Sequence, residues 1–206
     1  MTITRILVIG LLVCSSGWSN LVVQNNKKTI IRRLTVVKYP VELSFKLNGQ
    51  PLKSNEAVLF DQAIRTNEFD AEADWLRDFA ISVKNTSDKT ITYIVLNLRF
   101  PEVTRNGGAA LQQVLLGIDP DQKFSRPELR LAPNEVLEIP LAARYDDIGT
   151  LVKTVGSGFA IETLSKVEVE FHAALLDDQT LFQAGAWYRR NPDPNDPRRW
   201  IAIKEN

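Results

Sequence analysis

Cysteine and histidine are nearly absent from this sequence of 206 residues, which contains one of each, Cys14 and His172. A catalytic triad or a Cys-His pair would have to use His172, because no other imidazole is present. Removal of Cys14 by processing would leave no thiol, and would exclude disulfides and thiolate zinc sites. The domain would then be held together by its apolar core alone.

An excess of either charge is also lacking, since 25 Lys and Arg balance 25 Asp and Glu. Proteins that bind nucleic acid or anionic membranes without sequence specificity need a basic excess. The composition therefore argues against a nucleic-acid partner. Gly156-Ser157-Gly158 lacks the second half of a phosphate-binding loop and follows no predicted strand. We therefore predict no cofactor.

Apolar runs long enough to cross a membrane are lacking, so no transmembrane segment is predicted in the mature chain. Arg5 is followed by an apolar run at residues 6–14. This run is about half of the roughly 20 residues that a membrane-spanning helix needs. Small residues come next, and cleavage after Ser16 or Ser19 fits the small-residue rule for signal peptides. Residues 1–19 are therefore predicted to be a signal peptide; the alternative is a buried first strand.

Export to the periplasm or to the cell exterior follows from this signal. Cys14 could instead be the acylated cysteine of a lipoprotein, but bacterial lipid-anchoring sequences require a small residue where Val13 stands. A lipid anchor at Cys14 is therefore disfavoured. We expect a signal peptide at 1–19, an N-terminal lead-in segment at 20–38 and one domain at 39–204.

Alternation of apolar and polar residues, the period of a half-buried strand, dominates the rest of the chain. Turn-forming clusters separate the alternating runs, as at Asn85-Thr86-Ser87-Asp88. The predicted strands are residues 41–47, 79–83, 91–100, 114–118, 136–141, 167–172 and 181–188, with Pro101 ending the third. The expected core residues are Phe79, Ile81, Val83, Leu96, Leu98, Val167, Val169 and Phe171.

One helix interrupts this pattern, because apolar side chains at Ile148, Leu151, Val152 and Val155 share one helical face. Gly156 and Gly158 are expected to end the helix. Several short strands with one short helix between late strands predict an all-β fold, an immunoglobulin-like β-sandwich. Residues 54–70 fit either a helix or a loop.

Acidic residues gather at Asp70, Glu72 and Asp74. Paired carboxylates can hydrolyse glycosides or bind calcium, but the sequence does not fix their separation. A charged loop is the alternative. His172 shares a strand face with Glu168 and Glu170, and neighbouring side chains of one strand project in parallel. Such a set suits a single metal ion poorly, so we predict no metal site.

Two clusters of aromatic residues and arginines flank a proline-rich loop at residues 191–197. Trp, Tyr and Arg are enriched in binding hot spots, and arginine stacks on aromatic rings. The candidate partner-binding residues are Trp187, Tyr188, Arg189, Arg190, Arg198, Arg199 and Trp200. Alternatively, this segment is a clasp with both indoles inside. Continuous alternation from Leu181 would place Trp187 on the same face as Leu181, which favours the clasp.

Residues 69–101 resemble the middle of a group of uncharacterised exported bacterial proteins. The likeness rests on Asp74-Trp75-Leu76, Val83-Lys84-Asn85-Thr86-Ser87-Asp88-Lys89 and Leu98-Arg99-Phe100-Pro101. The C-terminus is similar as well, through Asp177-Asp178-Gln179-Thr180, Gly185, Arg189-Arg190 and Asn195-Asp196-Pro197-Arg198-Arg199-Trp200. Relatives have glycine where Gln179 stands. The resemblance spans residues 39–203 and implies one exported domain with an immunoglobulin-like pattern; it implies no activity.

We therefore expect a non-catalytic binding or structural module of the bacterial cell envelope or exterior, with a protein or a glycan as partner. The alternative is a hydrolase that uses Asp70, Glu72 and Asp74. A deep pocket with converging carboxylates would favour the enzyme, and a flat sandwich without a cleft would favour the module.

Export can be tested directly. N-terminal sequencing of the protein from an expressing bacterium should find a chain that starts between residues 15 and 20, where small residues follow the apolar run. Recovery of a cytoplasmic protein with Met1 intact would contradict the prediction.

Overall fold

The computed structural model describes residues 26–34, 39–59, 62–119, 121, 127–193 and 195–203, without the side chains of 33, 34, 55–59, 62 and 63. The predicted signal peptide, with Cys14, lies outside the described residues. The strands are β1 Lys27–Leu34, β2 Val41–Leu47, β3 Gln50–Pro51, β4 Asn55–Leu59, β5 Gln62–Asp70, β6 Phe79–Asn85, β7 Ile91–Arg105, β8 Gly108–Gly117, β9 Val136–Pro140, β10 Lys166–Leu176, β11 Thr180–Gln183, β12 Ala186–Arg190 and β13 Trp200–Ala202. The helix is α1 Tyr145–Val155, and the short 3₁₀ turns are η1 Trp75–Arg77, η2 Leu141–Arg144 and η3 Ile161–Thr163.

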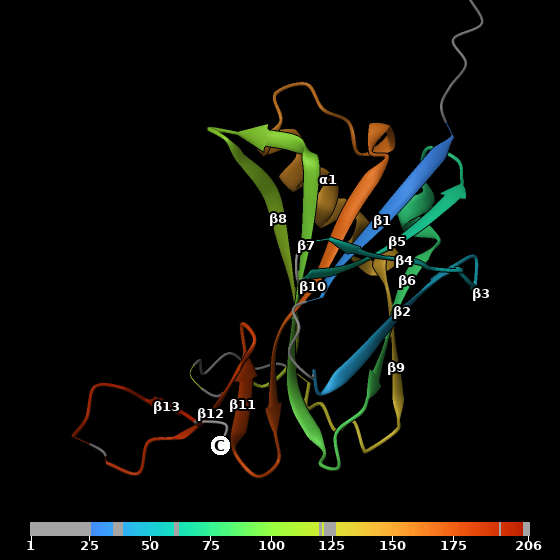
Figure 1. Cartoon of the computed structure of the whole chain (residues 1–206). Helices are drawn as coiled ribbons and strands as arrows, with labels where there is room; N and C mark the ends of the chain where they lie inside the picture. The colour runs from blue at the N-terminus through green and yellow to red at the C-terminus, as the bar shows by residue number, and fades with distance from the viewer. Residues whose placement is uncertain are drawn as a thin grey trace, which may run out of the picture.

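The strands form two sheets that share one apolar core (Figure 1). Within the described residues, the smaller sheet has the order β3-β2-β6-β9, and the larger sheet has nine strands. The predicted all-β sandwich with one short helix between late strands is confirmed, since α1 lies between β9 and β10 in the chain. The immunoglobulin-like strand order stays a prediction. Among the described residues, no helix combines the length and the apolar character that crossing a membrane requires.

The core follows the alternation in the sequence. All eight predicted core residues are buried: Phe79, Ile81, Val83, Leu96, Leu98, Val167, Val169 and Phe171. The side chain of Asn85, a buried polar residue, has hydrogen-bond partners both in its own turn and at Leu131. Its amide donates to the carbonyl oxygens of Lys89 and Leu131, at 2.7 and 2.9 Å, and its side-chain oxygen accepts from Ser87. The cluster of turn formers after β6 is therefore fixed by one side chain, which joins it to Leu131.

Several strands differ from the prediction. Within residues 54–70, expected as a helix or a loop, Asn55–Leu59 form β4 and Gln62–Asp70 form β5. Strand β7 continues past Pro101 to Arg105. The register between β7 and β8 shifts between Phe100 and Thr104, so the ladder does not need the N–H that Pro101 lacks. Asn106 and Gly107 then turn the chain with φ angles of 53° and 78°. An Asn-Gly pair is a strong hairpin signal, and it makes β7 and β8 longer than expected.

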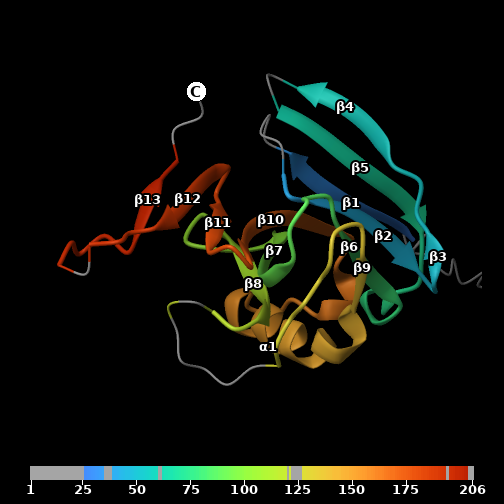
Figure 2. The same cartoon turned by 90° about the horizontal axis from the view of Figure 1, so that it is seen from below.

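Strand β10 is the centre of the larger sheet, and the sheet forks there. One edge of β10 pairs with β7 along its length. The other edge is shared: residues 166–169 pair with β1 in parallel, and residues 173–175 pair with β11. Figure 2 shows the two groups, β1-β5-β4 and β11-β12-β13, diverging from β10. Strand β1 lies within residues 20–38, the predicted lead-in segment. The larger sheet therefore includes residues from Lys27 onward, which precede the predicted domain start at residue 39.

Helix α1 packs against β7 and β8 through the face predicted for it, with Ile148 and Val152 buried. The helix ends at Gly156, as expected, but Gly156 is not in a left-handed conformation, since its φ is −100°. Glycine is needed there because the neighbouring side chains leave no space for a Cβ atom. A Cβ atom on Gly156 would lie 2.7 Å from Cγ1 of the buried Val103. Gly156 is therefore required by close packing between the helix end and β7.

Alanine substitutions at two glycines of this region should change the free energy of unfolding in opposite directions. Gly156→Ala should lower the free energy of unfolding by about 1–3 kcal/mol, the usual cost of overpacking a core. Gly149→Ala, inside α1 where the added Cβ would meet Ile161 only at 3.8 Å, should raise it by up to about 1 kcal/mol. Urea denaturation of both variants measures the difference. An unchanged midpoint for Gly156→Ala would show that the contact with Val103 is not limiting.

Candidate functional site

A β-bulge at His172 shapes the outer face of the larger sheet. Phe171 pairs with Leu96 and Ala173 pairs with Val95, so His172 has no partner on β7. A bulge re-aims the side chains beside it. Phe171 belongs to the main core, whereas both His172 and Ala173 line a cavity on the outer face. The bulge therefore places the single histidine of the chain beside that cavity.

The outer face has its own small apolar cluster, separate from the main core. Its buried members are Tyr93, Val95, Ala173, Leu175 and Leu181. Leu115, Tyr188 and Trp200 pack against them and are partly exposed. This cluster binds the β11-β12-β13 arm to the centre of the sheet from the outside, and it forms the base on which the candidate site is built.

A turn at Ala184-Gly185, with φ angles of 49° and 86°, divides the strand expected at residues 181–188 into β11 and β12. Phe182 then lies opposite Trp187, and Leu181 lies opposite Tyr188. The expected shared face of Leu181 and Trp187 is therefore wrong, because the turn breaks the alternation. Trp187 packs on the main core, with its ring centroid 5.1 Å from that of Phe182. Trp200 packs on the outer cluster instead.

Asp121 brings three of the predicted residues together. One of its carboxylate oxygens accepts the indole N–H of Trp200 at 2.9 Å. The other accepts from Arg199 at 3.2 Å and from Arg190 at 3.5 Å. The guanidinium of Arg190 also lies 5.3 Å from the centroid of the Trp200 ring. A single carboxylate thus fixes the position of one indole and two guanidinium groups.

A second carboxylate, Asp119, continues this network. It accepts the hydroxyl of Tyr93 at 3.1 Å and the backbone N–H of Asp121 at 2.8 Å. Neither aspartate was predicted from the sequence to belong to a site. Their spacing, Asp-x-Asp after the apolar end of β8, is common at turns, so only the proximity to the C-terminal segment distinguishes them. That proximity is a property of the fold.

The seven predicted partner-binding residues do not form one surface. Arg190, Arg199 and Trp200 gather at Asp121, and Tyr188 joins the outer cluster. Trp187 belongs to the main core. Arg189 is exposed, and the described part of the chain offers it no ion pair. Arg198 pairs with Asp196 in its own loop.

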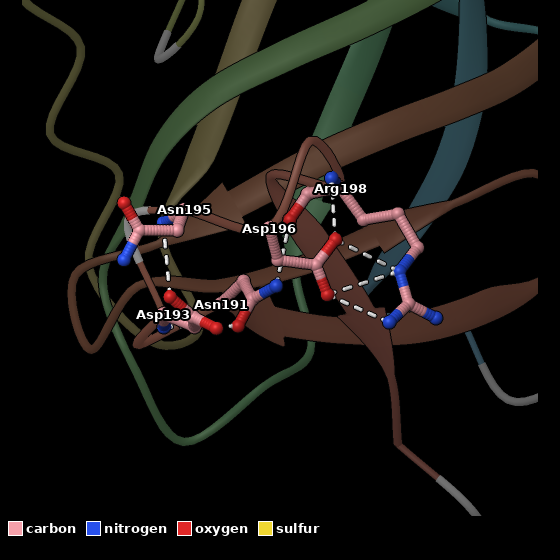
Figure 3. Close-up of polar contacts among 5 residues, drawn as sticks. All are labelled: Asn191, Asp193, Asn195, Asp196 and Arg198. Carbon is pink, nitrogen blue, oxygen red and sulfur yellow. Dashed lines mark hydrogen bonds and ion pairs between the residues drawn. The ribbon is translucent and has the colours of Figure 1, made fainter.

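The loop between β12 and β13 extends away from both sheets (Figure 1) and is braced by its own side chains (Figure 3). Side-chain oxygens of Asn191, Asp193 and Asp196 each accept the backbone N–H two residues on. Asp196 also receives the guanidinium of Arg198, at 2.6 Å. Hydrogen bonds from the side chain and backbone of Arg198 hold the pKa of Asp196 well below its usual range. These oxygens thus already accept hydrogen bonds from groups of the same loop.

The cavity on the outer face has a volume of about 290 Å³. Its buried lining residues are Tyr93, Val95, Ala173 and Leu181, and the polar group among them, the hydroxyl of Tyr93, donates to Asp119. Its partly or fully exposed polar side chains are Gln113, Asp119, Asp121, His172 and Gln183, with the indole of Trp200 among them. The imidazole of His172 has no hydrogen-bond partner within the described ranges. An apolar floor is therefore surrounded by hydrogen-bonding groups.

The acidic cluster proposed for hydrolysis lies elsewhere. Asp70, Glu72 and Asp74 are exposed, at the end of β5 and before η1, and none of them lines the outer-face cavity. The neighbouring Trp75 is structural: it is buried and donates its indole N–H to the carbonyl of Leu164 at 2.9 Å. In the described part of the chain, no group of His, Cys, Asp and Glu is arranged to hold a metal ion.

Comparison with known proteins finds no matching family model, no matching curated protein and no matching solved structure. The candidate site is therefore interpreted from its own geometry.

The two indoles of the C-terminal segment should contribute differently to stability. Trp187→Ala should lower the free energy of unfolding by about 2–3 kcal/mol, because it leaves a gap beside the fully buried Phe182. Trp200→Ala removes contacts from a small surface cluster and should cost about 1 kcal/mol. Urea midpoints measure both. Equal losses would favour the clasp, in which both indoles close the sandwich.

Proposed function

We propose that this protein is an exported, non-catalytic binding module of the bacterial cell envelope, and that it binds its partner at the outer-face cavity below the β12–β13 hairpin. The observation that carries the proposal is the convergence of Trp200, Arg190 and Arg199 on Asp121, at the rim of a cavity. Aromatic and arginine side chains of this kind supply most of the binding energy at interfaces.

The site is ordered before any ligand arrives. Asp121 holds the indole and the two guanidinium groups, and Asp119 holds the hydroxyl of Tyr93. Immobilising a flexible side chain on binding costs about 0.5–1.5 kcal/mol, and a preorganised site has less of this cost. His172 and Gln183 lie on strands of the larger sheet, which hold side chains more rigidly than a loop does. Asp119 and Asp121 lie in the turn after β8.

The same contacts favour binding over hydrolysis. A general acid or base must direct its carboxyl group at the substrate proton that it transfers. Both carboxylates of the cavity already accept hydrogen bonds from protein groups. His172 has no nucleophilic side chain bonded to it in the described ranges. These groups suit recognition of a bound molecule rather than proton transfer to it.

A capture experiment tests the proposal. The protein is immobilised and exposed to envelope extract, and both retained proteins and retained carbohydrate are quantified. Trp200→Ala and Asp121→Asn should each reduce specific capture at least about tenfold, the change expected when a hot-spot contact worth roughly 1.4 kcal/mol is lost.

The matched control is Lys153→Ala, at an exposed position of α1, whose buried face packs on the main core. This variant should capture as much as the unmodified protein. Capture that is equal for all four proteins, with each shown to be folded by its circular dichroism spectrum, would overturn the proposed site.

A further inference from the structure

We propose that the ligand of the outer-face cavity is a neutral pyranose unit of a glycan. This inference rests on the proposed function and specifies the chemistry of its ligand. It follows from three features of the cavity: the distribution of apolar and polar groups, the balance of charge, and the hydrogen-bonding groups that the protein itself leaves available.

The first feature is an apolar floor with a polar rim. Val95 and Leu181 are 95% buried, at 5% exposure each, and the indole of Trp200 and Leu115 adjoin them. Around this floor stand amide, carboxylate and imidazole groups. A pyranose ring has the complementary form, because its C–H groups present an apolar face and its hydroxyl groups form a hydrogen-bonding edge. Aromatic residues with one apolar and one polar part suit such a ligand.

The second feature is the absence of net charge at the site. Asp119 and Asp121 line the cavity and carry two negative charges. Arg190 and Arg199 do not line it, but they pair with Asp121 and carry two positive charges. Glu170, two residues before His172 in β10, is balanced by Arg99 at 3.6 Å. These charges sum to zero, so a charged ligand would gain little net attraction in return for the hydration that it loses on entering. The balance therefore favours a neutral, polyhydroxylated ligand over an anion or a cation.

The third feature is a set of unused hydrogen-bonding groups. In the described part of the chain, neither the imidazole of His172 nor the amide of Gln183 makes a side-chain hydrogen bond, and both line the cavity. A neutral imidazole and a carboxamide each offer a donor and an acceptor. A sugar hydroxyl is likewise both donor and acceptor. At about 290 Å³ the cavity is at the lower limit for small-molecule sites, which suits about one ring of an oligosaccharide.

The indole N–H signals of the ¹⁵N-labelled protein give a site-specific test. Maltotriose, cellotriose and N,N′,N″-triacetylchitotriose, three neutral trisaccharides that differ in linkage or substituents, are titrated in turn. At least one should shift the Trp200 signal to saturation with a Kd of about 1 mM, typical of a small ligand with few contacts. The signal of buried Trp75, which is bonded to Leu164, should not move.

Two comparisons make the test specific. Gln183→Ala removes a rim group that makes no side-chain hydrogen bond in the described part of the chain, and should weaken binding at least about fivefold, as expected for one lost hydrogen bond. The glucosamine trimer and trigalacturonate have similar rings with positive and negative charges, and each should bind at least about tenfold more weakly than the best neutral trisaccharide.

The inference is overturned if none of the neutral trisaccharides shifts the Trp200 signal, or if a charged trimer binds more tightly. In that event the capture experiment separates the two proposals. Capture that still depends on Trp200 and Asp121 would mean that the site is real and its ligand class is different. Capture that does not depend on them would reject the site itself.

Discussion

A single extra residue in the central strand β10 lies at the point where the larger sheet divides. Because His172 has no partner on β7, the register shifts between Phe171 and Ala173. Before the bulge, the free edge of β10 pairs with β1, and after it the edge pairs with β11. The fork therefore gives the chain two arms from one strand. One arm extends the sandwich, and the other carries the aromatic and arginine residues to the outer face.

The apolar cluster of the outer face is small, so polar contacts also connect the C-terminal arm to the sheet. Asp121 provides these contacts by accepting hydrogen bonds from Trp200, Arg199 and Arg190. Exposed ion pairs alone contribute about 0–1 kcal/mol to stability. The importance of Asp121 is therefore geometric: it sets the position of the indole that closes one side of the cavity. The self-braced loop beyond β12 serves the same purpose for Arg199, whose backbone carbonyl accepts from Asn191 at 2.9 Å.

Local pattern was sufficient to predict much of this fold, and non-local pairing explains most of what could not be predicted. Strand β2 and the core of β6 follow directly from alternation, which depends only on neighbouring residues. The parallel pairing of β1 with β10 joins segments far apart in the chain, so the local sequence pattern of residues 27–34 did not predict that they belong to the domain. In the site, residue type identified Trp200 and the arginines, but their partner Asp121 comes from a distant turn. The turn at Ala184-Gly185 places Trp187 on the face opposite to the expected one. The sequence did not predict this turn, because alanine is an unusual residue at positive φ.

The central claim is that the outer-face cavity is where this protein binds. Cysteine placed in the cavity and labelled with a bulky maleimide tests it most directly, because Cys14 is the single natural cysteine and lies in the predicted signal peptide. Gln183→Cys labelled in this way should lose capture of the envelope ligand, whereas Lys153→Cys, labelled equally on α1, should retain it. Undiminished capture by the labelled Gln183→Cys protein would contradict the account.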